Sequence, residues 1–297
     1  MPDGIERYLD ELKRSLTGCD PATIQDALSD AEDHLRTALD QTLRNDPNRM
    51  ETEALQMIVE KYGTPQETAA AYREIESRTT PALAGTGGDA GERSWAGKVF
   101  GVLAEPRAYG ALLYMFFALA TGIMYFTWTV TGISLSAGLI VLIIGLPFIG
   151  VFLLSIHGIA LVEGRIVEAL LGVRMPRRPL FSQKHLGVWR RFKTLLGDRI
   201  TWTTILYMIV MLPLGIVYFT LFVTMMVFVL RLIGSPIFDL IFDFPVMMLG
   251  DTAYYIPDWT VPFAVFAGII WLIVTLHLAR VIGRMHGAIA KNLLVRD

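Results

Sequence analysis

The feature that most constrains the fold of this sequence is a set of four long apolar segments in its last two thirds. A helix needs about 20 mostly apolar residues to cross the hydrocarbon core of a bilayer. None of the four segments has a charged residue near its middle. The expected spans are residues 108–130, 135–156, 202–230 and 262–278. We therefore predict an all-α polytopic membrane protein with four transmembrane helices, the first two joined by a hairpin turn at residues 131–134.

The first 80 residues differ from the rest in charge. They contain 17 Asp and Glu against 9 Lys and Arg, whereas the remainder is net basic. Apolar residues recur at helical spacing, between stop and start signals such as Gly18, Asp20-Pro21 and the Thr64-Glu67 capping box. The expected helices cover about residues 3–17, 21–43, 51–62 and 65–77. The sequence thus predicts a small cytoplasmic helical domain of four helices over residues 1–77.

Three stretches of this domain are typical of one family. They are IERYLDELKRSL, ALSDAEDHLRTAL and ALQMIVEKYGTPQETAAAYRE, and together they cover roughly residues 3–77. The most specific is the last, an amphipathic helix followed by Tyr-Gly-Thr-Pro and a second helix. The domain resembles the HAAS-type alpha-helical signalling domain of bacterial membrane proteins. That resemblance implies a protein-interaction module, whose partner would be a PadR-like helix-turn-helix regulator.

The segment that follows this domain lacks periodicity. Residues 78–94 are rich in Gly, Thr and Ala, which is typical of a flexible linker. The membrane domain is then expected over residues 95–297.

Basic residues are unevenly divided between the loops of the membrane domain. The loop at 157–201 contains nine Lys and Arg, whereas the loop at 231–258 contains Arg231 with four Asp. Because loops rich in Lys and Arg stay in the cytoplasm, we expect both termini there. The single cysteine, Cys19, cannot form an intrachain disulfide and suits a reducing compartment. The expected location is the bacterial cytoplasmic (inner) membrane, with several passes.

The membrane domain contains an internal repeat. LYMFFALATGIMYFT at 113–127 aligns without gaps on LYMIVMLPLGIVYFT at 206–220, with nine identities in fifteen positions. Both halves start on the same side, so the sequence predicts two parallel pseudo-repeats related by an axis along the membrane normal. The matched glycines, Gly122 and Gly215, are expected at close helix contacts, where small residues let backbones approach.

Two further segments repeat downstream. IGLPF at 144–148 echoes IGSPI at 233–237, and EGRIVEALLGV at 163–173 resembles HGAIAKNLLV at 286–295. Glycine and proline in the first pair are expected to shape helices rather than to catalyse a reaction. These residues are Gly145, Pro147, Gly234 and Pro236.

The order of these segments also resembles a known membrane domain. LIIGLPFIG, EGRIVEALLGVRMP and the repeat are similar to the bacterial "putative sensor" domain over about residues 105–296. That domain is often fused to histidine kinases, and we expect this chain to depart from the kinase-linked form. We therefore expect any output to pass through the helical domain or a partner.

The outer loop is the candidate ligand site. Asp239 and Asp243 lie four residues apart among apolar residues, so they would share one helix face. With Asp251, Tyr254 and Tyr255 they would form a pocket for an amphiphilic or cationic ligand. Alternatively, the segment is a surface helix that closes the bundle.

The basic loop is the candidate lipid-binding segment. Its cations are expected to bind anionic lipid headgroups, and direct nucleic acid binding is not expected of a loop held at the membrane. The residues are Arg174, Arg177, Arg178, Arg190, Arg191 and Lys193.

Two other groups of polar residues have open interpretations. His157, His277 and His286 are expected near the cytoplasmic leaflet. His157 and His277, on facing spans, have the chemistry to ligate haem, but all three are also typical of polar groups near helix ends. Glu163 and Glu168 after the second span would either pair with Arg280 and Arg284 after the fourth, or be solvated separately. No metal and no cofactor is expected.

The sequence contains no recognisable catalytic motif. It has no GxxxxGK[ST], HExxH, GxSxG or CxxC pattern, so we predict that it is not an enzyme. The favoured hypothesis is a membrane sensor or regulatory protein that passes an envelope or lipid-borne signal to a cytoplasmic partner. The alternative is an accessory structural subunit of a larger membrane complex, such as a transporter or an electron-transfer assembly.

Overall fold

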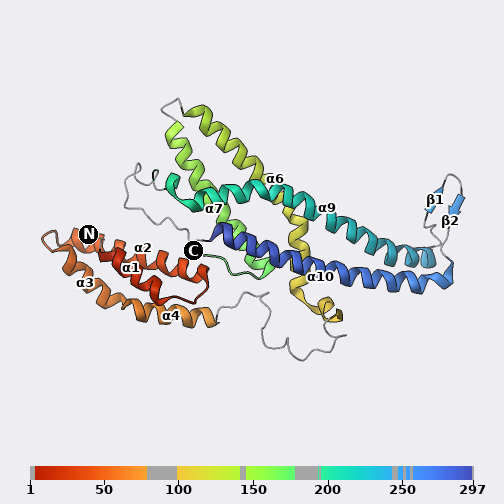
Figure 1. Ribbon diagram of the computed structural model, residues 1–297, viewed down its shortest axis with the longest axis horizontal. Coiled ribbons are helices and arrows are strands. Elements are labelled where there is room, and N and C mark those ends of the chain that lie inside the picture. Colours follow the sequence, from red (N-terminus) through yellow and green to blue (C-terminus); the bar gives the residue numbers. More distant parts are fainter. Residues whose placement is uncertain are drawn as a thin grey trace.

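Helices make up nearly all of the computed structural model of the chain (Figure 1). Among the described residues the strands are β1 (Met247–Leu249) and β2 (Thr252–Tyr254), which form a short antiparallel ribbon. The residues that the structure describes are 4–78, 99–140, 145–177, 193, 195–242, 247–249, 252–254 and 257–295. The predicted linker at 78–94 lies almost entirely outside them.

The N-terminal part consists of four short helices, close to the expected ranges. They are α1 (Gly4–Ser15), α2 (Pro21–Asn45), α3 (Glu51–Tyr62) and α4 (Pro65–Arg78). Asp20 caps α2 by accepting a hydrogen bond from the Ala22 N–H at 2.9 Å. At α4, Glu67 accepts one from the Thr64 N–H at 2.8 Å, and this bond lowers the pKa of the Glu67 carboxyl. Local capping chemistry therefore sets where these helices begin.

These four helices enclose a hydrophobic core of their own. Tyr8 closes it by donating a hydrogen bond from its hydroxyl to the Gly63 carbonyl at 2.9 Å. The buried apolar residues are Ile5, Tyr8, Leu12, Leu16, Ala27, Ala31, Leu35, Leu39, Ala54, Ile58 and Ala69. We call residues 4–78 the helical domain.

The described residues after position 99 include four long helices, each long and apolar enough to cross a membrane. They are α6 (Pro106–Leu139), α7 (Gly145–Leu171), α9 (Arg199–Phe242) and α10 (Val261–Leu294). The short 3₁₀ helices η1 (Gly101–Ala104) and η2 (Asp258–Thr260) precede α6 and α10. The prediction of an all-α chain with four apolar helices is confirmed.

The structure corrects the position of the first hairpin. The turn expected at 131–134 is wrong, because α6 continues through these residues to Leu139 and α7 begins at Gly145 instead of residue 135. Gly132 is a contact residue: a Cβ added there would lie 1.9 Å from the Phe152 ring of α7. A glycine that looks like a turn signal in the sequence therefore serves close helix packing.

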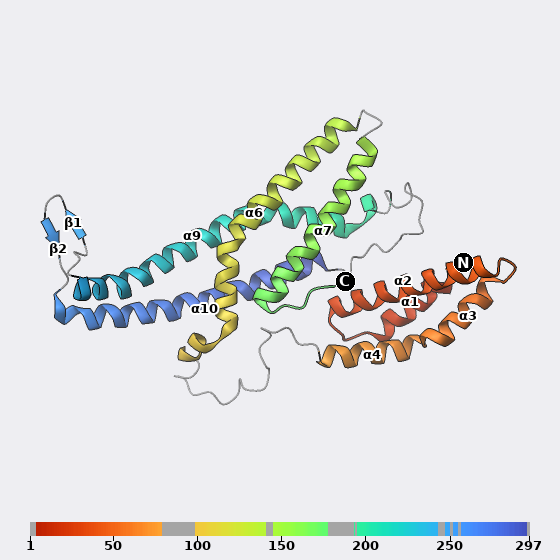
Figure 2. The same cartoon turned by 180° about the vertical axis from the view of Figure 1, so that it is seen from behind.

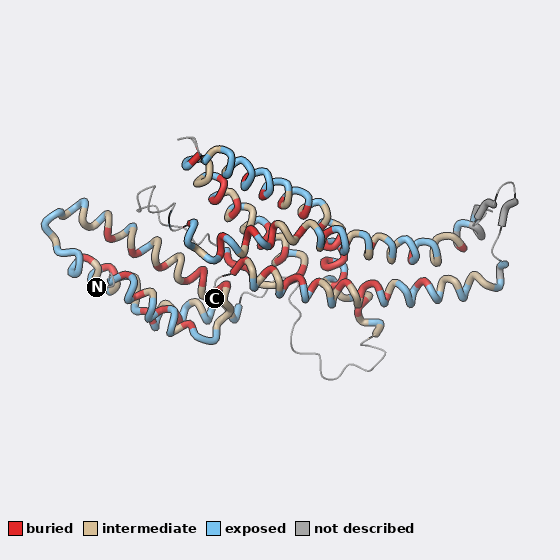
Figure 3. The backbone as a smooth tube through the Cα atoms, turned by 45° about the horizontal axis from the view of Figure 1, so that its top comes forward, coloured by how far each residue is buried: buried red, intermediate tan, exposed pale blue. Residues whose placement is uncertain are grey.

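The long helices pack mainly where α6 crosses α9. Figures 1 and 2 show α9 and α10 running side by side beyond this crossing, and the C-terminal end of α10 lying next to the helical domain. Figure 3 shows that the buried residues gather around the crossing, whereas the outer faces are exposed. The outer faces carry large apolar side chains such as Phe117, Val151, Phe228 and Phe263. Such faces are stable against lipid tails rather than water.

Candidate functional site

A buried carboxylate lies at the centre of the four long helices. Glu163 of α7 is 0% exposed. Its Oε1 accepts hydrogen bonds from the hydroxyls of Tyr114 at 2.6 Å and Tyr207 at 2.7 Å, and its Oε2 accepts one from Tyr125 at 2.7 Å. Tyr114 and Tyr125 come from α6, and Tyr207 comes from α9. Three helices are thus joined through one side chain.

The fourth helix contributes an imidazole. His286 of α10 is also 0% exposed, and its Nε2 lies 2.6 Å from the Tyr114 hydroxyl and 3.1 Å from the Tyr207 hydroxyl. Its Nδ1 lies 3.4 Å from the hydroxyl of Tyr218 on α9. The six residues Tyr114, Tyr125, Glu163, Tyr207, Tyr218 and His286 are called the buried cluster below.

The buried cluster has the symmetry of the sequence repeat. Tyr114 pairs with Tyr207 and Tyr125 with Tyr218 in the alignment of the two halves, and Glu163 aligns with His286 in the downstream repeat. Each half therefore supplies two tyrosines and one ionisable residue. Glu163 and His286 each lie eight residues before the end of their helix.

Sequence reasoning aligned these residues, and it considered Glu163 for an ion pair between the halves and His286 among the histidines near the cytoplasmic leaflet, but it did not place the six together. The usable signal was the pairing of two tyrosines eleven residues apart in both halves, because eleven residues are about three helical turns and return to the same face. A tyrosine pair on one face in each half, together with an ionisable residue at equivalent positions, points to a shared polar centre. Polar residues buried within membrane helices are costly and mark functional sites.

The repeat also governs how α6 and α9 meet. A Cβ added to Gly122 of α6 would lie 2.7 Å from the Met211 carbonyl oxygen of α9. A Cβ added to Gly215 of α9 would lie 2.4 Å from the Ala118 carbonyl oxygen of α6. The two glycines thus make reciprocal close contacts, one from each half.

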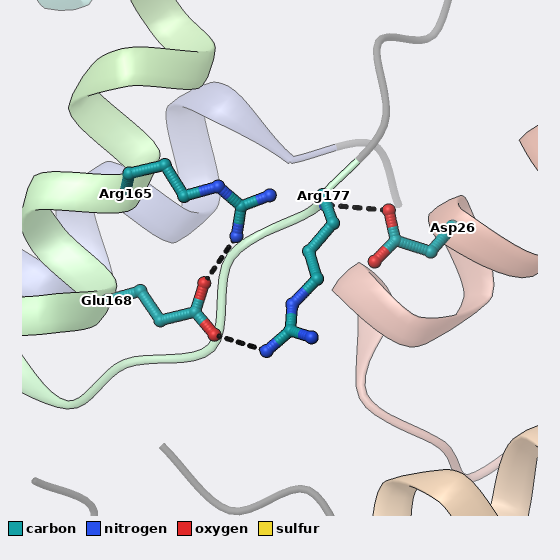
Figure 4. A network of polar contacts seen from close by, with 4 residues as sticks. All are labelled: Asp26, Arg165, Glu168 and Arg177. Carbon is teal, nitrogen blue, oxygen red and sulfur yellow. Dashed lines mark hydrogen bonds and ion pairs between the residues drawn. The ribbon is translucent and has the colours of Figure 1, made fainter. Parts of the chain in front are cut away.

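The helical domain contacts α10 and the segment after α7 through two aspartates, Asp20 at the N-cap of α2 and Asp26 within α2. Asp20 accepts a hydrogen bond and ion pair from Lys291 of α10 at 2.5 Å. Asp26 accepts a hydrogen bond from the backbone N–H of Arg177 at 2.7 Å, and the Arg177 side chain pairs with Glu168 of α7 at 3.3 Å (Figure 4). We call the contacts of Asp20 and Asp26 the docking contacts.

The docking contacts are linked in sequence to the buried cluster. Glu168 follows Glu163 by five residues on α7, and Lys291 follows His286 by five residues on α10. Glu168 and Lys291 are themselves equivalent in the downstream repeat. The helical domain is therefore held at matching positions of the two halves, one directly and one through Arg177.

Comparison with protein-family models assigns both parts of the chain. The model described as "Putative sensor" matches residues 114–294, which is more than half of the chain. The chain belongs to the "Putative sensor" family. The HAAS model matches residues 7–71, so both expected resemblances are confirmed. Comparison with curated proteins and with solved structures gave no match.

The sensor match begins at Tyr114 and contains the whole buried cluster. Sensor and HAAS domains are families of non-catalytic kinds, and together they indicate a sensor or regulatory role for the chain. Among the described residues, no group of three or more His, Cys, Asp or Glu side chains is arranged to hold a metal ion.

The residues of the predicted ligand pocket at 239–255 fall at the edge of what the structure describes. Asp239 lies in α9 and Tyr254 in β2, but the positions of their side chains are not described. Asp243, Asp251 and Tyr255 lie outside the described residues. The proposed ligand pocket there stays a prediction.

The basic residues after α7 divide in the same way. Arg178, Arg190 and Arg191 lie outside the part of the chain that the structure describes, and Lys193 is exposed. Arg177 contacts Glu168 and Asp26, so it takes part in docking the helical domain. Lipid binding by Arg174 and its neighbours stays a prediction.

The two candidate haem ligands each bond to their own helix. Nδ1 of His157 lies 2.8 Å from the Leu153 carbonyl, and Nδ1 of His277 lies 3.0 Å from the Ile273 carbonyl. Both contacts join residues four apart, as expected for polar side chains in apolar helices.

The ion pairs proposed between the two halves are wrong in their partners. Glu163 contacts tyrosines instead of arginine, and Glu168 pairs with Arg165 and Arg177. Arg280 pairs with Glu105, just before α6, at 2.8 Å. A solvated interpretation of Glu163 is also wrong, because the helix crossing buries it completely.

The two Gly-x-Pro segments have different environments. Gly145 and Pro147 lie in the first turn of α7, and a Cβ on Gly145 would lie 2.0 Å from the Leu139 carbonyl oxygen of α6. Gly234 and Pro236 lie inside the continuous α9, and a Cβ on Gly234 would meet nothing within 4 Å. The same short repeated segment therefore begins a helix in one half and lies within a helix in the other.

Proposed function

We propose that the chain is a membrane sensor in which a change among the four long helices is passed to the docked helical domain. The observation that carries this proposal is the pair of docking contacts, Asp20 with Lys291 and Asp26 with Arg177. They join the HAAS part of the chain to the sensor part at the ends of α7 and α10. In a sensor of this arrangement, these contacts would connect the long helices, which receive the signal, to the helical domain, which passes it on.

The buried cluster supports the proposal because two of its residues, Glu163 and His286, lie on α7 and α10, the helices whose last turns support the docking contacts. Glu163 and His286 bond through Tyr114, so the cluster sets how α7 and α10 lie relative to each other. Five residues further along each helix, Glu168 and Lys291 support the docking contacts. A shift of α7 against α10 at the cluster would therefore move the two supports of the helical domain apart.

The output would be a change in which face of α2 is accessible. Gln25 and Asp26 are buried in the docked arrangement, at 6% and 9% exposure. Undocking would expose these polar groups to a cytoplasmic partner. A PadR-like helix-turn-helix regulator is the partner that the HAAS domain suggests, and an envelope or lipid-borne stimulus is the input that suits a membrane location.

A charge exchange tests the docking contacts. Asp20→Lys and Lys291→Asp should each weaken docking by about 1 kcal/mol, because each leaves two like charges facing. The double variant should regain docking relative to Asp20→Lys, which lacks the Asp20 cap of α2 in the same way, since the ion pair is rebuilt with its charges exchanged. Spin labels at the exposed positions Met57 and Val162, in a Cys19→Ser background, would report the distance between the two parts. Broad distances in both single variants and a narrow distance in the double variant are expected. A narrow distance in all three variants would contradict the proposal.

The proposed topology has its own test. With both termini in the cytoplasm, a cysteine replacing Asp251 should react with an impermeant maleimide added to intact cells. A cysteine replacing Arg178 should react only after the cells are opened. The loop charges motivate this expectation, because nine Lys and Arg lie at 157–201. The opposite labelling pattern would show that the orientation is inverted.

A further inference from the structure

We propose that the buried cluster is a proton-binding site, which holds one proton on His286 opposite the Glu163 carboxylate. The pocket that the docked helical domain helps to line would give the proton access. The argument rests on hydrogen-bond geometry, on charge and on this pocket.

The hydrogen bonds determine where a proton can be added. Tyr114 donates its only hydroxyl hydrogen to Glu163, so its 2.6 Å contact with His286 requires Nε2 to carry the hydrogen and donate. In the neutral ring Nδ1 is then an acceptor, facing the Tyr218 hydroxyl at 3.4 Å. Nδ1 can take a proton without loss of any other bond in the cluster, because the Tyr218 hydroxyl can turn and accept.

Protonation of Glu163 itself would be more disruptive. Three hydroxyls donate to its two oxygens, and a carboxyl hydrogen would have to displace one of them or compete with it. His286 is therefore the acceptor that leaves the three tyrosine bonds to the carboxylate in place.

The charge of the cluster favours this proton. Among the described residues, no lysine or arginine forms an ion pair with Glu163, whose contacts are the three tyrosine hydroxyls. Burial alone disfavours an imidazolium, but it also disfavours an uncompensated carboxylate. With one proton on His286, the two opposite charges face each other across the Tyr114 hydroxyl and the cluster is neutral overall. A pair separated by a single hydroxyl interacts strongly in a medium of low dielectric constant.

The other charged groups near His286 are engaged elsewhere. Three tyrosine hydroxyls face the ring, one from Tyr114 of α6 and two from Tyr207 and Tyr218 of α9. The Glu163 carboxylate of α7 is connected to the ring through Tyr114. On α10 itself, Arg280 pairs with Glu105, Arg284 is exposed, and Lys291 pairs with Asp20. Glu163 is thus the acidic group positioned to compensate a charge on His286.

A small pocket that includes the residue after Glu163, but none of the six cluster residues themselves, is the proposed entrance for the proton. Gly164, which adjoins Glu163, lines it together with His157, Thr204 and Gln25 of the helical domain. The Thr204 hydroxyl is buried and has no hydrogen-bond partner among the described residues. The pocket is lined mostly by apolar side chains, but the unsatisfied Thr204 hydroxyl, with the nearby Gln25 and His157 side chains, offers partners for a water molecule that can carry a proton. Because Gln25 belongs to α2, docking of the helical domain covers part of this route.

The site would make protons one stimulus of the sensor. Proton binding to the cluster is argued here independently of docking, but its effect on the helical domain rests on the proposed function. Neutralising the cluster should tighten the connection of α7 and α10 through Tyr114. The four long helices should then be more stable when the proton is bound.

The test is the pH dependence of thermal unfolding of the full-length protein in detergent. Between about pH 8 and about pH 5, where histidine commonly titrates, the melting temperature of the wild type should rise by several degrees relative to His286→Gln. Glu163→Gln should also lack this rise, because it removes the charge that favours the proton. His277→Gln is the matched control on α10 and should keep it.

Two outcomes would overturn the proposal. One is a pH dependence that is the same in the wild type and in His286→Gln, and the other is a melting temperature that falls toward acid relative to that variant. If His286→Gln does not fold, histidine ring NMR on the wild type decides, with Tyr218→Phe used to assign the His286 signal. A His286 ring that stays neutral over the whole pH range would also overturn it.

The same measurement separates this proposal from the docking proposal. In the Asp20→Lys variant docking is weakened if the proposed function holds, yet the pH-dependent rise should remain. Loss of docking with the rise intact would support a proton site by itself. A rise that is absent in the wild type, with docking intact, would reject the proton site and leave the proposed function standing.

Discussion

Replacing Glu163 with alanine is expected to lower the free energy of unfolding of the membrane part by about 3–5 kcal/mol, the largest effect of any single substitution that we predict. The carboxylate accepts hydrogen bonds from Tyr114, Tyr125 and Tyr207, so alanine leaves three buried hydroxyls without their acceptor. It also leaves a cavity where three helices meet. Thermal unfolding in detergent, followed by circular dichroism, would measure the loss.

Two other variants make this test specific. Glu163→Gln keeps an acceptor oxygen and should cost less, about 1–2 kcal/mol. Glu168→Ala lies five residues further along the same helix and removes ion pairs with Arg165 and Arg177 near the surface. That control should cost less than about 1 kcal/mol. If Glu163→Ala unfolds at the same temperature as Glu168→Ala, the buried cluster does not hold the helices together.

The second large effect is expected at the crossing of α6 and α9. Gly215→Leu and Gly122→Leu should each destabilise the protein by about 2–3 kcal/mol through overpacking. The obstacle is backbone: the new Cβ would lie 2.4 Å from the Ala118 carbonyl oxygen in one case and 2.7 Å from that of Met211 in the other. Flexible side chains can move aside, but a helix backbone can do so only by separating the two helices.

A glycine of the same bundle provides the control. A Cβ added to Gly158 of α7 would meet nothing within 4 Å, so Gly158→Leu should be nearly neutral. Ile123→Leu and Ile216→Leu, next to the two packed glycines but on exposed positions, should be neutral as well. Melting temperatures in detergent would rank the variants. Equal melting of the wild type and both packed-glycine variants would mean that these glycines face lipid.

Local signals were sufficient for the helical domain. The ends of its helices are set by capping side chains that bond to backbone groups only a few residues away, as at Asp20 and at Thr64 with Glu67. Such interactions depend on neighbours in the chain and not on the rest of the fold. For this reason the predicted boundaries agree with α1 to α4 to within a few residues.

The first hairpin of the membrane part shows where local signals mislead. Thr131, Gly132 and Ser134 are typical of a turn, yet α6 continues through them. The decisive fact is the Phe152 ring of α7, which lies where a side chain at position 132 would be. A residue more distant in sequence thus decides the role of this glycine, and no local pattern carries that information.

The sequence by itself determined the four apolar helices, the helical domain and the repeat that aligns Tyr114 with Tyr207 and Glu163 with His286. It could do so because hydrophobicity, capping and internal similarity are properties of the linear chain. Only the tertiary structure brought those aligned residues together, since their contact depends on how α6, α7, α9 and α10 cross. It also decided that Glu163 is buried against tyrosines instead of paired with arginine. The reason is physical: a charged residue near a helix end is equally compatible with solvent and with a polar interior, and packing alone selects between them.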